Sequence, residues 1–509
     1  MLASDSKATL LRPAGYNERR YITRQSLGYY RTLAIGGIYT VDQASATKIS
    51  QQTFVPALKH CVATHPLLSA TIEGQDTESP SFARPKTLDL HNHVEILRTD
   101  DLGSGAADFS EKDLIHRVTN RTLDFEFSNV EITPPWKIVV FLLPSQDGAQ
   151  RLFVLFAYYH SHGDGKSALA FHKTFLQGLN QESNVGDNFL CETPSVPLPP
   201  TIEQAGKLSI SWSYLLSPLF GAYLPEAVAK SLGLRASTTP KSADAWTGKR
   251  VPFNHDTFDT GLEFFSVPHQ TMHAALRLCR AHDVKFTGLL HQLIVRALSE
   301  ALPSGPTIGS FIASTVVDLR PLLNGIGPDD MSCPGPTAAF ELFSRSKPTD
   351  WNNWIQPQSD SPIWTAARRT TKDVAKCAST LHDQPIGLLS YLSKFRPWMQ
   401  GEAEKDRDTS YEISNLGIFD PTAGSQKGAW DVESMFFAQP ANLLGGCLAF
   451  SVVTRKGGDM TVSVTWQERT LGVEEEQAFV ARICQLITQY LGEIAWTTLE
   501  GGARASGNV

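Results

Sequence analysis

The chain has 509 residues, of which 41% are hydrophobic and 19% charged, and it carries a formal net charge of −7. This composition is typical of a soluble globular protein, and the length fits about two or three domains with a large core. The negative charge, without a basic block or a run of interleaved aromatic residues, argues against a nucleic-acid partner.

Seven cysteines are scattered along the chain with no close pair. This spacing indicates neither a zinc site nor a disulfide framework, and an odd, dispersed set favours reduced thiols. The N-terminal segment MLASDSKATLLRP lacks the continuous apolar core of a signal peptide. We therefore expect an intracellular, cytoplasmic protein that holds no metal ion.

The N-terminal half alternates strand-like and helix-like segments, which is typical of an α/β domain. An apolar stripe over residues 54–62 has a helical period, and the turn-like segment 144–150 predicts that the two strands beside it form a hairpin. The sheet would then be mixed. The expected strands cover residues 31–40, 67–72, 93–97, 136–143 and 151–159.

A proline-rich crossover follows over residues 191–260, and within it Leu208 to Pro225 contains no charged residue. Its apolar residues fall on one helical face, but Pro218 and four serines make it a poor transmembrane span. A helix lying on a membrane surface and a cover over a substrate tunnel are two interpretations. An ordinary helix packed on the second domain is slightly favoured over membrane contact, because the polar face lacks lysine and arginine. The apolar residues are Leu208, Trp212, Leu215, Leu216, Leu219 and Tyr223.

The second half repeats the alternation of strands and helices. Thr287 is the expected N-cap of a helix whose apolar residues run from Leu289 to Leu298. Residues 448–453 and 460–466 predict a hairpin, because polar and apolar residues alternate in the second strand. Further strands are expected at 263–267 and 308–318, with helices beginning near residue 272 and spanning 474–491.

The stretch from Tyr158 to Gly165, with the sequence YYHSHGDG, lies between the buried strand 151–159 and a helix-like segment. A side chain at the end of a central strand is held by rigid backbone and meets a substrate in a fixed pose. Histidine exchanges protons near neutral pH, so His160 is a candidate general base toward a hydroxyl or thiol. A single histidine at a strand end is nevertheless more often a hydrogen-bonded structural residue.

A second cluster lies at residues 411–417, where a short strand ends in small polar residues. Attack on a carbonyl group leaves negative charge on its oxygen, and a hydrogen-bond donor must be positioned there. Ser414 and Asn415 are candidates for this donor, although the sequence Ser-Asn-Leu-Gly alone more often forms a turn.

The pattern H-x-x-x-D-G after a buried strand resembles the superfamily of chloramphenicol acetyltransferase, BAHD enzymes and condensation domains. Several other segments are similar to segments of the fungal alcohol acetyltransferase family and follow one another in the same order as in that family. This resemblance spans nearly the whole chain. The Asp-Phe-Gly-Trp-Gly motif of the plant branch is missing, which weakens a plant-type assignment. The segments that carry the resemblance are Arg19–Tyr21, Leu27–Gly28, Trp246–Gly248, Ala313–Pro321, Ser414–Gly417 and Gln439–Asn442.

The resemblance implies an α/β fold of two similar chloramphenicol acetyltransferase-like domains, each with a mixed sheet flanked by helices, and an active site in the tunnel between them. We expect an N-terminal domain over residues 1–190, a linker over 191–260 and a C-terminal domain over 261–509. The implied reaction is transfer of an acyl group, expected to be acetyl, from acyl-CoA to a small-molecule alcohol, possible acceptors including secondary metabolites. Acetyl-CoA would be a co-substrate, no cofactor would stay bound, and the protein would be a monomer.

The same resemblance assigns roles to individual residues. His160 would be the base, Asp164 a structural residue paired with Arg320, and Ser414 or Asn415 the donor to the oxyanion. His162 has no role in the family pattern. We expect it to line the turn or the substrate pocket, together with Tyr158, Gly163 and Gly165.

Two alternatives stay open at this point. One is a condensation-type enzyme that takes its acyl group from a carrier protein. The other is a family member that transfers no acyl group and uses the cleft for binding or cyclisation.

Overall fold

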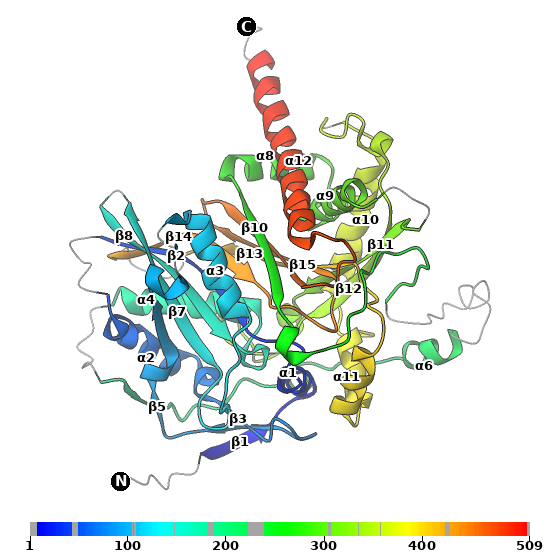
Figure 1. The fold of residues 1–509 in the computed structure, drawn as a ribbon. Helices are drawn as coiled ribbons and strands as arrows, with labels where there is room; N and C mark the ends of the chain where they lie inside the picture. The colour runs from blue at the N-terminus through cyan, green and yellow to red at the C-terminus, as the bar shows by residue number, and fades with distance from the viewer. Residues whose placement is uncertain are drawn as a thin grey trace.

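The structure of the protein is a computed structural model, which describes the chain apart from residues 1–7, 43–48, 104, 106–107, 147, 182–187, 222–238, 304–306, 334, 357, 423–427 and 506–509. Two mixed β-sheets lie side by side, and helices cover them (Figure 1). The predicted α/β fold with two mixed sheets is therefore confirmed.

The first sheet has five strands in the order β14-β2-β8-β7-β6. Its central strand β8 contains a run of apolar residues, and Leu152 to Tyr158 are almost completely buried, as expected for a strand covered on both faces. Helices α2 (Val55–Thr64) and α4 (Gly165–Leu179) pack together on this sheet, and α3 (Glu111–Leu123) packs against it as well. The strands are β2 (Leu33–Asp42), β6 (Val94–Leu97), β7 (Trp136–Gln146), β8 (Ala149–Tyr158) and β14 (Trp430–Ala438).

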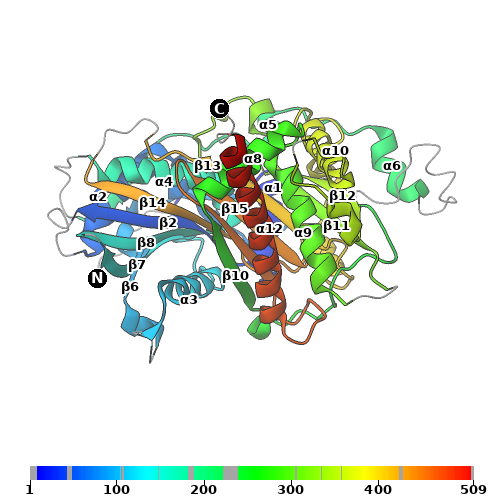
Figure 2. The same ribbon diagram turned by 90° about the horizontal axis from the view of Figure 1, so that it is seen from above.

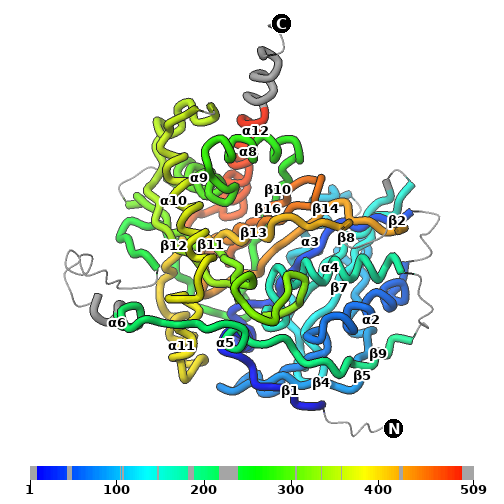
Figure 3. Tube along the Cα trace, turned by 180° about the vertical axis from the view of Figure 1, so that it is seen from behind, coloured from blue at the N-terminus to red at the C-terminus, as the bar shows by residue number. Residues whose placement is uncertain are grey.

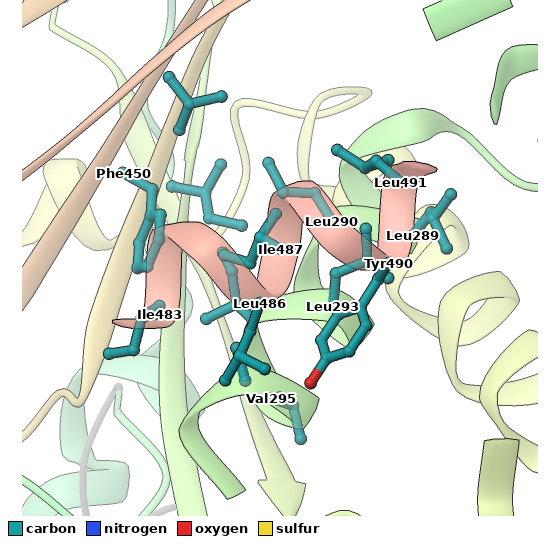
Figure 4. Packing of buried hydrophobic residues seen from close by; sticks show 14 of the residues in the cluster. Leu289, Leu290, Leu293, Val295, Phe450, Ile483, Leu486, Ile487, Tyr490 and Leu491 are labelled. Carbon is teal, nitrogen blue, oxygen red and sulfur yellow. The ribbon is translucent and has the colours of Figure 1, made fainter. Parts of the chain in front are cut away.

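The second sheet has six strands in the order β10-β16-β15-β13-β11-β12. An apolar core lies between this sheet and four helices. These helices are α8 (His269–Ala281), α9 (Phe286–Ala301), α10 (Pro362–Cys377) and α12 (Glu476–Ala505). Figure 4 shows side chains of α9 and α12 meeting Phe450 of β15 in this core. The strands are β10 (Thr260–Val267), β11 (Ser310–Val317), β12 (Thr337–Ser344), β13 (Tyr411–Phe419), β15 (Leu448–Arg455) and β16 (Met460–Gln467).

Strand β14 joins the two halves of the chain. It comes from the C-terminal half, yet it pairs antiparallel with β2 at the edge of the first sheet. The view from above shows β14 beside β2 while β13 and β15 belong to the neighbouring sheet (Figure 2). The two sheets are therefore not each built from one contiguous half of the chain, and the domain boundaries at 190 and 261 stay a prediction.

The remaining elements lie around the ends of the sheets. Helix α1 (Tyr16–Ser26) packs against α11 (Phe395–Ala403) and against the turn that contains His160. Helix α6 (Trp212–Gly221) lies at the periphery, apart from both sheets (Figure 3). The shorter elements are β1 (Thr9–Pro13), β3 (Thr71–Glu73), β4 (Ser81–Arg84), β5 (Thr87–Asp89), β9 (Leu190–Glu192), α5 (Ile202–Ala205) and the 3-10 helices η6 (His160–His162) and η10 (Pro385–Tyr391).

Both predicted hairpins are present, because β7 pairs antiparallel with β8 and β15 with β16. The prediction for Thr287 is wrong: Lys285 is the N-cap of α9, and Thr287 lies inside its first turn. The predicted apolar helix over 208–225 is observed only over Trp212–Gly221, as α6; residues 208–211 are not helical, and residues 222–225 lie outside the described residues. Within the described part of the chain, no helix is both long and apolar enough to cross a membrane.

Candidate active site

The turn between β8 and α4 is built from short-range contacts that fix its shape. Asp164 is the N-cap of α4, and its Oδ1 accepts a hydrogen bond from the backbone N–H of Ser167 (3.0 Å). Gly163 has a φ of +151°, and a Cβ atom there would lie 2.7 Å from the Cβ of Ser167. A glycine is therefore required one residue before the cap, and the turn holds His160 at the end of the central strand.

Asp164 and Arg320 form a bidentate ion pair. Arg320 Nη1 lies 2.6 Å from Asp164 Oδ2, and Nη2 lies 2.7 Å from Oδ1. Burial alone would raise the pKa of Asp164, but the charge and hydrogen bonds of Arg320 lower it below its ordinary value. The structure thus brings together two residues that lie 156 positions apart in the sequence, in the pair that the resemblance implied.

The His160 imidazole lies against helix α1. Its ring stacks on Tyr21 with a centroid distance of 3.8 Å and an angle of 8° between the planes, and the Tyr30 ring lies 6.0 Å away. The backbone is also fixed, because Cys333 Sγ donates to the carbonyl oxygen of His160 (3.1 Å). The side-chain amide of Gln25 has one orientation in which both its nitrogen and its oxygen are hydrogen-bonded. In this orientation its oxygen accepts from the backbone N–H of His160 (2.6 Å), and its nitrogen donates to the carbonyl oxygen of Tyr21.

His160 is neutral in this environment. Its pKa is lowered to about 3, mainly by burial and then by the positive charge of Arg24, while Asp164 has a smaller opposing effect. The Nδ1 atom is buried and has no hydrogen-bond partner on another described residue. The imidazole is therefore unprotonated, which is the form that a general base requires.

Two arginines of α1 flank the stacked pair of Tyr21 and His160. The guanidinium of Arg24 lies over the Tyr30 ring, 3.8 Å from its centroid, and that of Arg20 lies 4.8 Å from the centroid of Tyr21. Both Nε atoms are buried without a hydrogen-bond partner, and neither guanidinium pairs with a carboxylate within the described chain. This side of the site therefore carries positive charge that faces the aromatic rings and interacts with the buried carboxyl group of Glu412.

Strand β13 of the second sheet reaches this turn. A Cβ atom at Gly165 would lie 2.2 Å from a methyl group of Leu416, so β13 packs directly against the first residue of α4. Lys166 Nζ also donates to the carbonyl oxygen of Leu416 (2.6 Å). The segment 414–417 thus lies beside the turn that carries His160, although the two are about 250 residues apart in sequence.

Residues of β13 alternate between two faces of the sheet. Tyr411 and Ile413 belong to the core of the second sheet, whereas Leu416 belongs to the core of the first sheet. Ser414 shares the face of Leu416, directed toward the first sheet. Asn415 lies on the other face, where its Nδ2 donates to Thr287 Oγ1 (3.3 Å) and its Oδ1 accepts from the N–H of Gly417 (2.9 Å). Of the two candidate donors, only Ser414 lies on the face of β13 directed toward the first sheet, which carries His160.

Glu412 lies on the same face of β13 as Ser414. Its Oε1 accepts a hydrogen bond from Gln439 (3.3 Å), and the hydroxyl of Tyr30 donates to Gln439 Oε1 (3.2 Å). The pKa of Glu412 is raised because the carboxyl group is buried. This chain of hydrogen bonds connects Tyr30, which lies beside His160, with the second sheet.

Four other predicted site residues pack against protein atoms, and their assignment to a substrate pocket stays a prediction. The hydroxyl of Tyr158 donates to the carbonyl oxygen of Asp164 (2.9 Å), and His162 is bonded through Nε2 to the carbonyl oxygen of Ala70 (2.8 Å). Both side chains are fully buried. Gly163 and Gly165 allow the close approaches of Ser167 and Leu416 described above.

Sequence reasoning missed the contact of α1 with His160. Arg20 and Tyr21 were part of the family resemblance, but no role was assigned to them. Tyr21 and Arg24 are three residues apart, a spacing that places both on one face of a helix. Recognising α1 as a helix would have predicted this common face, but its contact with His160 depends on tertiary packing. Among the described residues, no group of three or more His, Cys, Asp or Glu side chains is arranged to hold a metal ion.

Comparison with known sequences identifies related proteins. Residues 370–491 match the family model of alcohol acetyltransferases. The chain is 25% identical to "Probable alcohol acetyltransferase FCK4" of Fusarium pseudograminearum, over 91% of each chain. It is 22% identical to "Probable alcohol acetyltransferase crmB" of Aspergillus fumigatus, over 91% of this chain and 96% of the other.

Comparison with solved structures identifies the fold. The structure resembles the trichothecene 15-O-acetyltransferase TRI3 of Fusarium sporotrichioides with a TM-score of 0.62 and 14% identity, over 96% of each chain. It also resembles the condensation domain of the Monacolin K polyketide synthase MokA, with a TM-score of 0.57 and 12% identity, over 96% of this chain and 99% of the other. The predicted resemblance to alcohol acetyltransferases is confirmed, and the fold is shared with a condensation domain.

Proposed function

We infer that this chain, which resembles alcohol acetyltransferases in sequence and shares their two-sheet fold, is an O-acetyltransferase that acts on the hydroxyl group of a small-molecule alcohol. The observation that carries this inference is the similarity to proteins named alcohol acetyltransferases along about nine-tenths of the chain. The neutral, stacked imidazole of His160 at the contact between the two sheets supports the same chemistry.

We propose a direct transfer in which His160 is the general base. The imidazole takes the proton of the acceptor hydroxyl while the oxygen attacks the carbonyl carbon of the thioester. The carbonyl oxygen becomes an oxyanion, to which the hydroxyl of Ser414 donates a hydrogen bond. The carbon–sulfur bond then breaks, CoA leaves as the thiol with the proton that His160 had accepted, and the acetyl ester remains.

In this proposal Asp164 and Arg320 do not touch the reacting atoms. Their bidentate pair ties the cap of α4 to the segment that follows β11. The pair therefore supports the turn, and it keeps the Asp164 carboxylate directed away from the imidazole. The negative charge of Asp164 still raises the pKa of His160 a little, against the larger lowering effect of burial.

Acetyl-CoA is the proposed acyl donor. Similarity to a condensation domain leaves a carrier-protein donor as the alternative, but that likeness extends only to the fold. Incubation of the protein with acetyl-CoA and a panel of hydroxylated metabolites, followed by mass spectrometry, tests the proposal. We expect an acetylated product and stoichiometric free CoA. Transfer only from an acetylated carrier protein, or no transfer from either donor, would refute it.

We also propose that the protein acts in the cytoplasm as a monomer, with a peripheral membrane contact through residues 208–225. The seven cysteines are unpaired, which suits a reducing compartment. Trp212 in α6 is 75% exposed, and exposed tryptophan side chains favour the membrane interface. Flotation with phospholipid vesicles tests the contact: Trp212→Ser should weaken co-flotation, and equal recovery of both proteins would refute it.

A further inference from the structure

The orientation of the His160 imidazole is not set by hydrogen bonds. Within the described part of the chain, neither of its nitrogens forms a hydrogen bond with another residue. A histidine ring turns easily about χ2, because this torsion has a broad energy minimum. In many enzymes a carboxylate fixes a base histidine by accepting a hydrogen bond from its second nitrogen. Asp164 does not do so here, since Arg320 engages both of its oxygens.

The ring of Tyr21 restricts the imidazole instead. The two rings are nearly parallel, with a centroid distance of 3.8 Å and an angle of 8° between the planes. A turn about χ2 would push the edge of the imidazole into the face of the Tyr21 ring, well inside the separation of about 3.5–4.0 Å that carbon atoms prefer. Tyr21 has little room to move aside, because it is 2% exposed and the guanidinium groups of Arg20 and Arg24 lie 4.8 and 5.1 Å from its centroid.

Gln25 fixes the backbone of His160 from the same helix. Its side-chain oxygen accepts from the backbone N–H of His160 (2.6 Å), and its side-chain nitrogen donates to the carbonyl oxygen of Tyr21 (3.2 Å). Residues four positions apart lie on one face of a helix. A single face of α1 therefore contacts both the ring and the backbone of His160.

We propose that Tyr21 and Gln25 are positioning residues for the proton transfer: the Tyr21 ring sets the plane of the imidazole, Gln25 sets its backbone, and Nε2 is thereby aimed at the acceptor hydroxyl. This inference rests on the proposed function. Nε2 is the nitrogen left for the acceptor, because Nδ1 is buried. A base must lie within about 2.6–3.2 Å of the group whose proton it takes, and a misplacement of about 1 Å costs about 10²-fold in rate.

Two substitutions of Tyr21 test the role of the flat ring. Tyr21→Phe keeps the ring, whereas Tyr21→Met fills a similar space with a flexible chain. With acetyl-CoA and the alcohol of the panel above that the wild type acetylates, we expect kcat to fall by about 10²-fold in Tyr21→Met and to stay within about threefold in Tyr21→Phe. KM for acetyl-CoA should stay within about threefold in both, because the residue orients the base and does not bind the donor. Wild-type kcat in Tyr21→Met, or an equal loss in Tyr21→Phe, would overturn the inference.

Tyr490→Met is the matched control for the loss of a buried ring. Tyr490 is 1% exposed, lies on α12, and has the guanidinium of Arg296 at 3.8 Å from its centroid, but it belongs to the core of the second sheet (Figure 4). Tyr490→Met should lower the midpoint of urea unfolding while kcat stays within about threefold of the wild type. A fall in kcat as large as that of Tyr21→Met would show that lost packing alone explains the effect, and it would overturn the inference.

Gln25→Leu provides a second variant that decides the matter if Tyr21→Met does not fold. Loss of the hydrogen bond frees the backbone of His160, and we expect kcat to fall by about 3- to 10-fold. The control is Gln384→Leu, because Gln384 is 3% exposed and also joins backbone groups, donating to the carbonyl oxygens of Cys377 (3.0 Å) and Thr380 (2.8 Å). Equal kcat values for Gln25→Leu and Gln384→Leu would overturn the inference.

An NMR spectrum of the histidine rings separates this inference from the proposed function. Histidine labelled with carbon-13 at Cε1 gives one signal for each ring, and the signal lost in His160→Ala belongs to His160. The ring current of a stacked aromatic ring should shift its Hε1 proton upfield in the wild type and in Tyr21→Phe, but not in Tyr21→Met. If the wild type transfers no acetyl group, the proposed function fails, and this spectrum still tests the stack because it needs no substrate. An unchanged His160 signal in Tyr21→Met would overturn the inference.

Discussion

His160 combines two properties that oppose each other in a catalytic base. Its pKa of about 3 keeps the imidazole neutral at every pH where the protein is expected to be folded, so the proton-accepting form is always present. A weak base, however, accepts a proton only as negative charge develops nearby. The expected compensation comes from the reaction itself, since the anionic intermediate forms beside the imidazole and stabilises its cation.

Arg24 is one of the groups that hold the pKa of His160 low, after burial. Replacing it as in Arg24→Met should raise that pKa, because a positive charge near the imidazole is removed. The acid limb of the profile of kcat/KM against pH lies below the pH range of the folded protein in the wild type, and it should move to higher pH, toward that range, in Arg24→Met. The exposed Arg280 provides the control, and Arg280→Met should leave the profile unchanged. An identical acid limb in Arg24→Met and the wild type would contradict this account.

Asp164 is expected to act through structure rather than through contact with substrate. Asp164→Asn leaves the buried guanidinium of Arg320 without its counter-charge, and breaking a buried pair costs roughly 3 to 5 kcal/mol. Activity and the midpoint of urea unfolding should therefore fall together. Asp318→Asn is the control, because Asp318 lies 3.4 Å from the same guanidinium but is more exposed, and it should change stability much less. Loss of activity at wild-type stability in Asp164→Asn would show that the carboxylate has a chemical role.

At the scale of elements, strands with strong periodicity were predictable from sequence. The uniformly apolar run of β8 and the alternation in β16 indicated strands, and short turns indicated their hairpin partners. Strand β14 was missed because a bulge between Val432 and Ser434 interrupts its alternation. Its pairing with β2 joins residues about 400 positions apart, and no local pattern specifies such a contact.

The candidate site was predictable to a similar degree. The pair of Asp164 and Arg320 followed from the family resemblance, but the choice between Ser414 and Asn415 depends on which face of β13 each occupies. Adjacent residues of a strand always face opposite sides, so the sequence predicts that only one is suitable without indicating which. The contact of α1 with His160 also depends on packing between distant segments.

The close approach of β2 and β14, which come from different halves of the chain, can be tested at a glycine of β2. A Cβ atom at Gly37 would lie 1.9 Å from the backbone oxygen of Ser434 in β14. Gly37→Ala should therefore push β14 away and lower the free energy of unfolding by about 1–3 kcal/mol, as measured by chemical denaturation. Gly401→Ala in α11 is the control, since nothing lies within 4 Å, and it should be neutral or stabilising by up to about 1 kcal/mol. Wild-type stability of Gly37→Ala would show that the strands can separate without cost.

At the scale of the whole molecule, ion pairs and buried polar groups connect the two halves. Arg151 of β8 bonds to Glu111 of α3 and to Glu433 of β14.

Buried histidines are numerous, and burial lowers the pKa of each. Their values are about 4 for His65, His93, His162 and His172, and about 3 for His160 and His291.

These histidines predict a loss of stability in acid. Between pH 6.5 and about 4 their imidazoles bind protons in the unfolded chain but not in the folded chain, so acidification favours unfolding. Each histidine contributes up to about 1.4 kcal/mol per pH unit, and the free energy of unfolding should fall by several kcal/mol from pH 7.5 to 5.5. Asp124, whose pKa is raised to about 6 by burial, opposes the trend to a smaller extent. Urea denaturation at both pH values measures the difference, and equal or greater stability at pH 5.5 would contradict the prediction.

The central claim is that two sheets meet at one imidazole that accepts the proton of an alcohol. The most direct measurement is kcat/KM for acetyl transfer by His160→Ala, with acetyl-CoA and an acceptor that the wild type acetylates. His91→Ala is the control, because His91 is exposed and lies far from the turn in sequence. We expect His160→Ala to keep the wild-type circular dichroism spectrum while kcat/KM falls by about 10²- to 10⁴-fold. A folded His160→Ala protein with activity within a few-fold of the wild type would contradict the account.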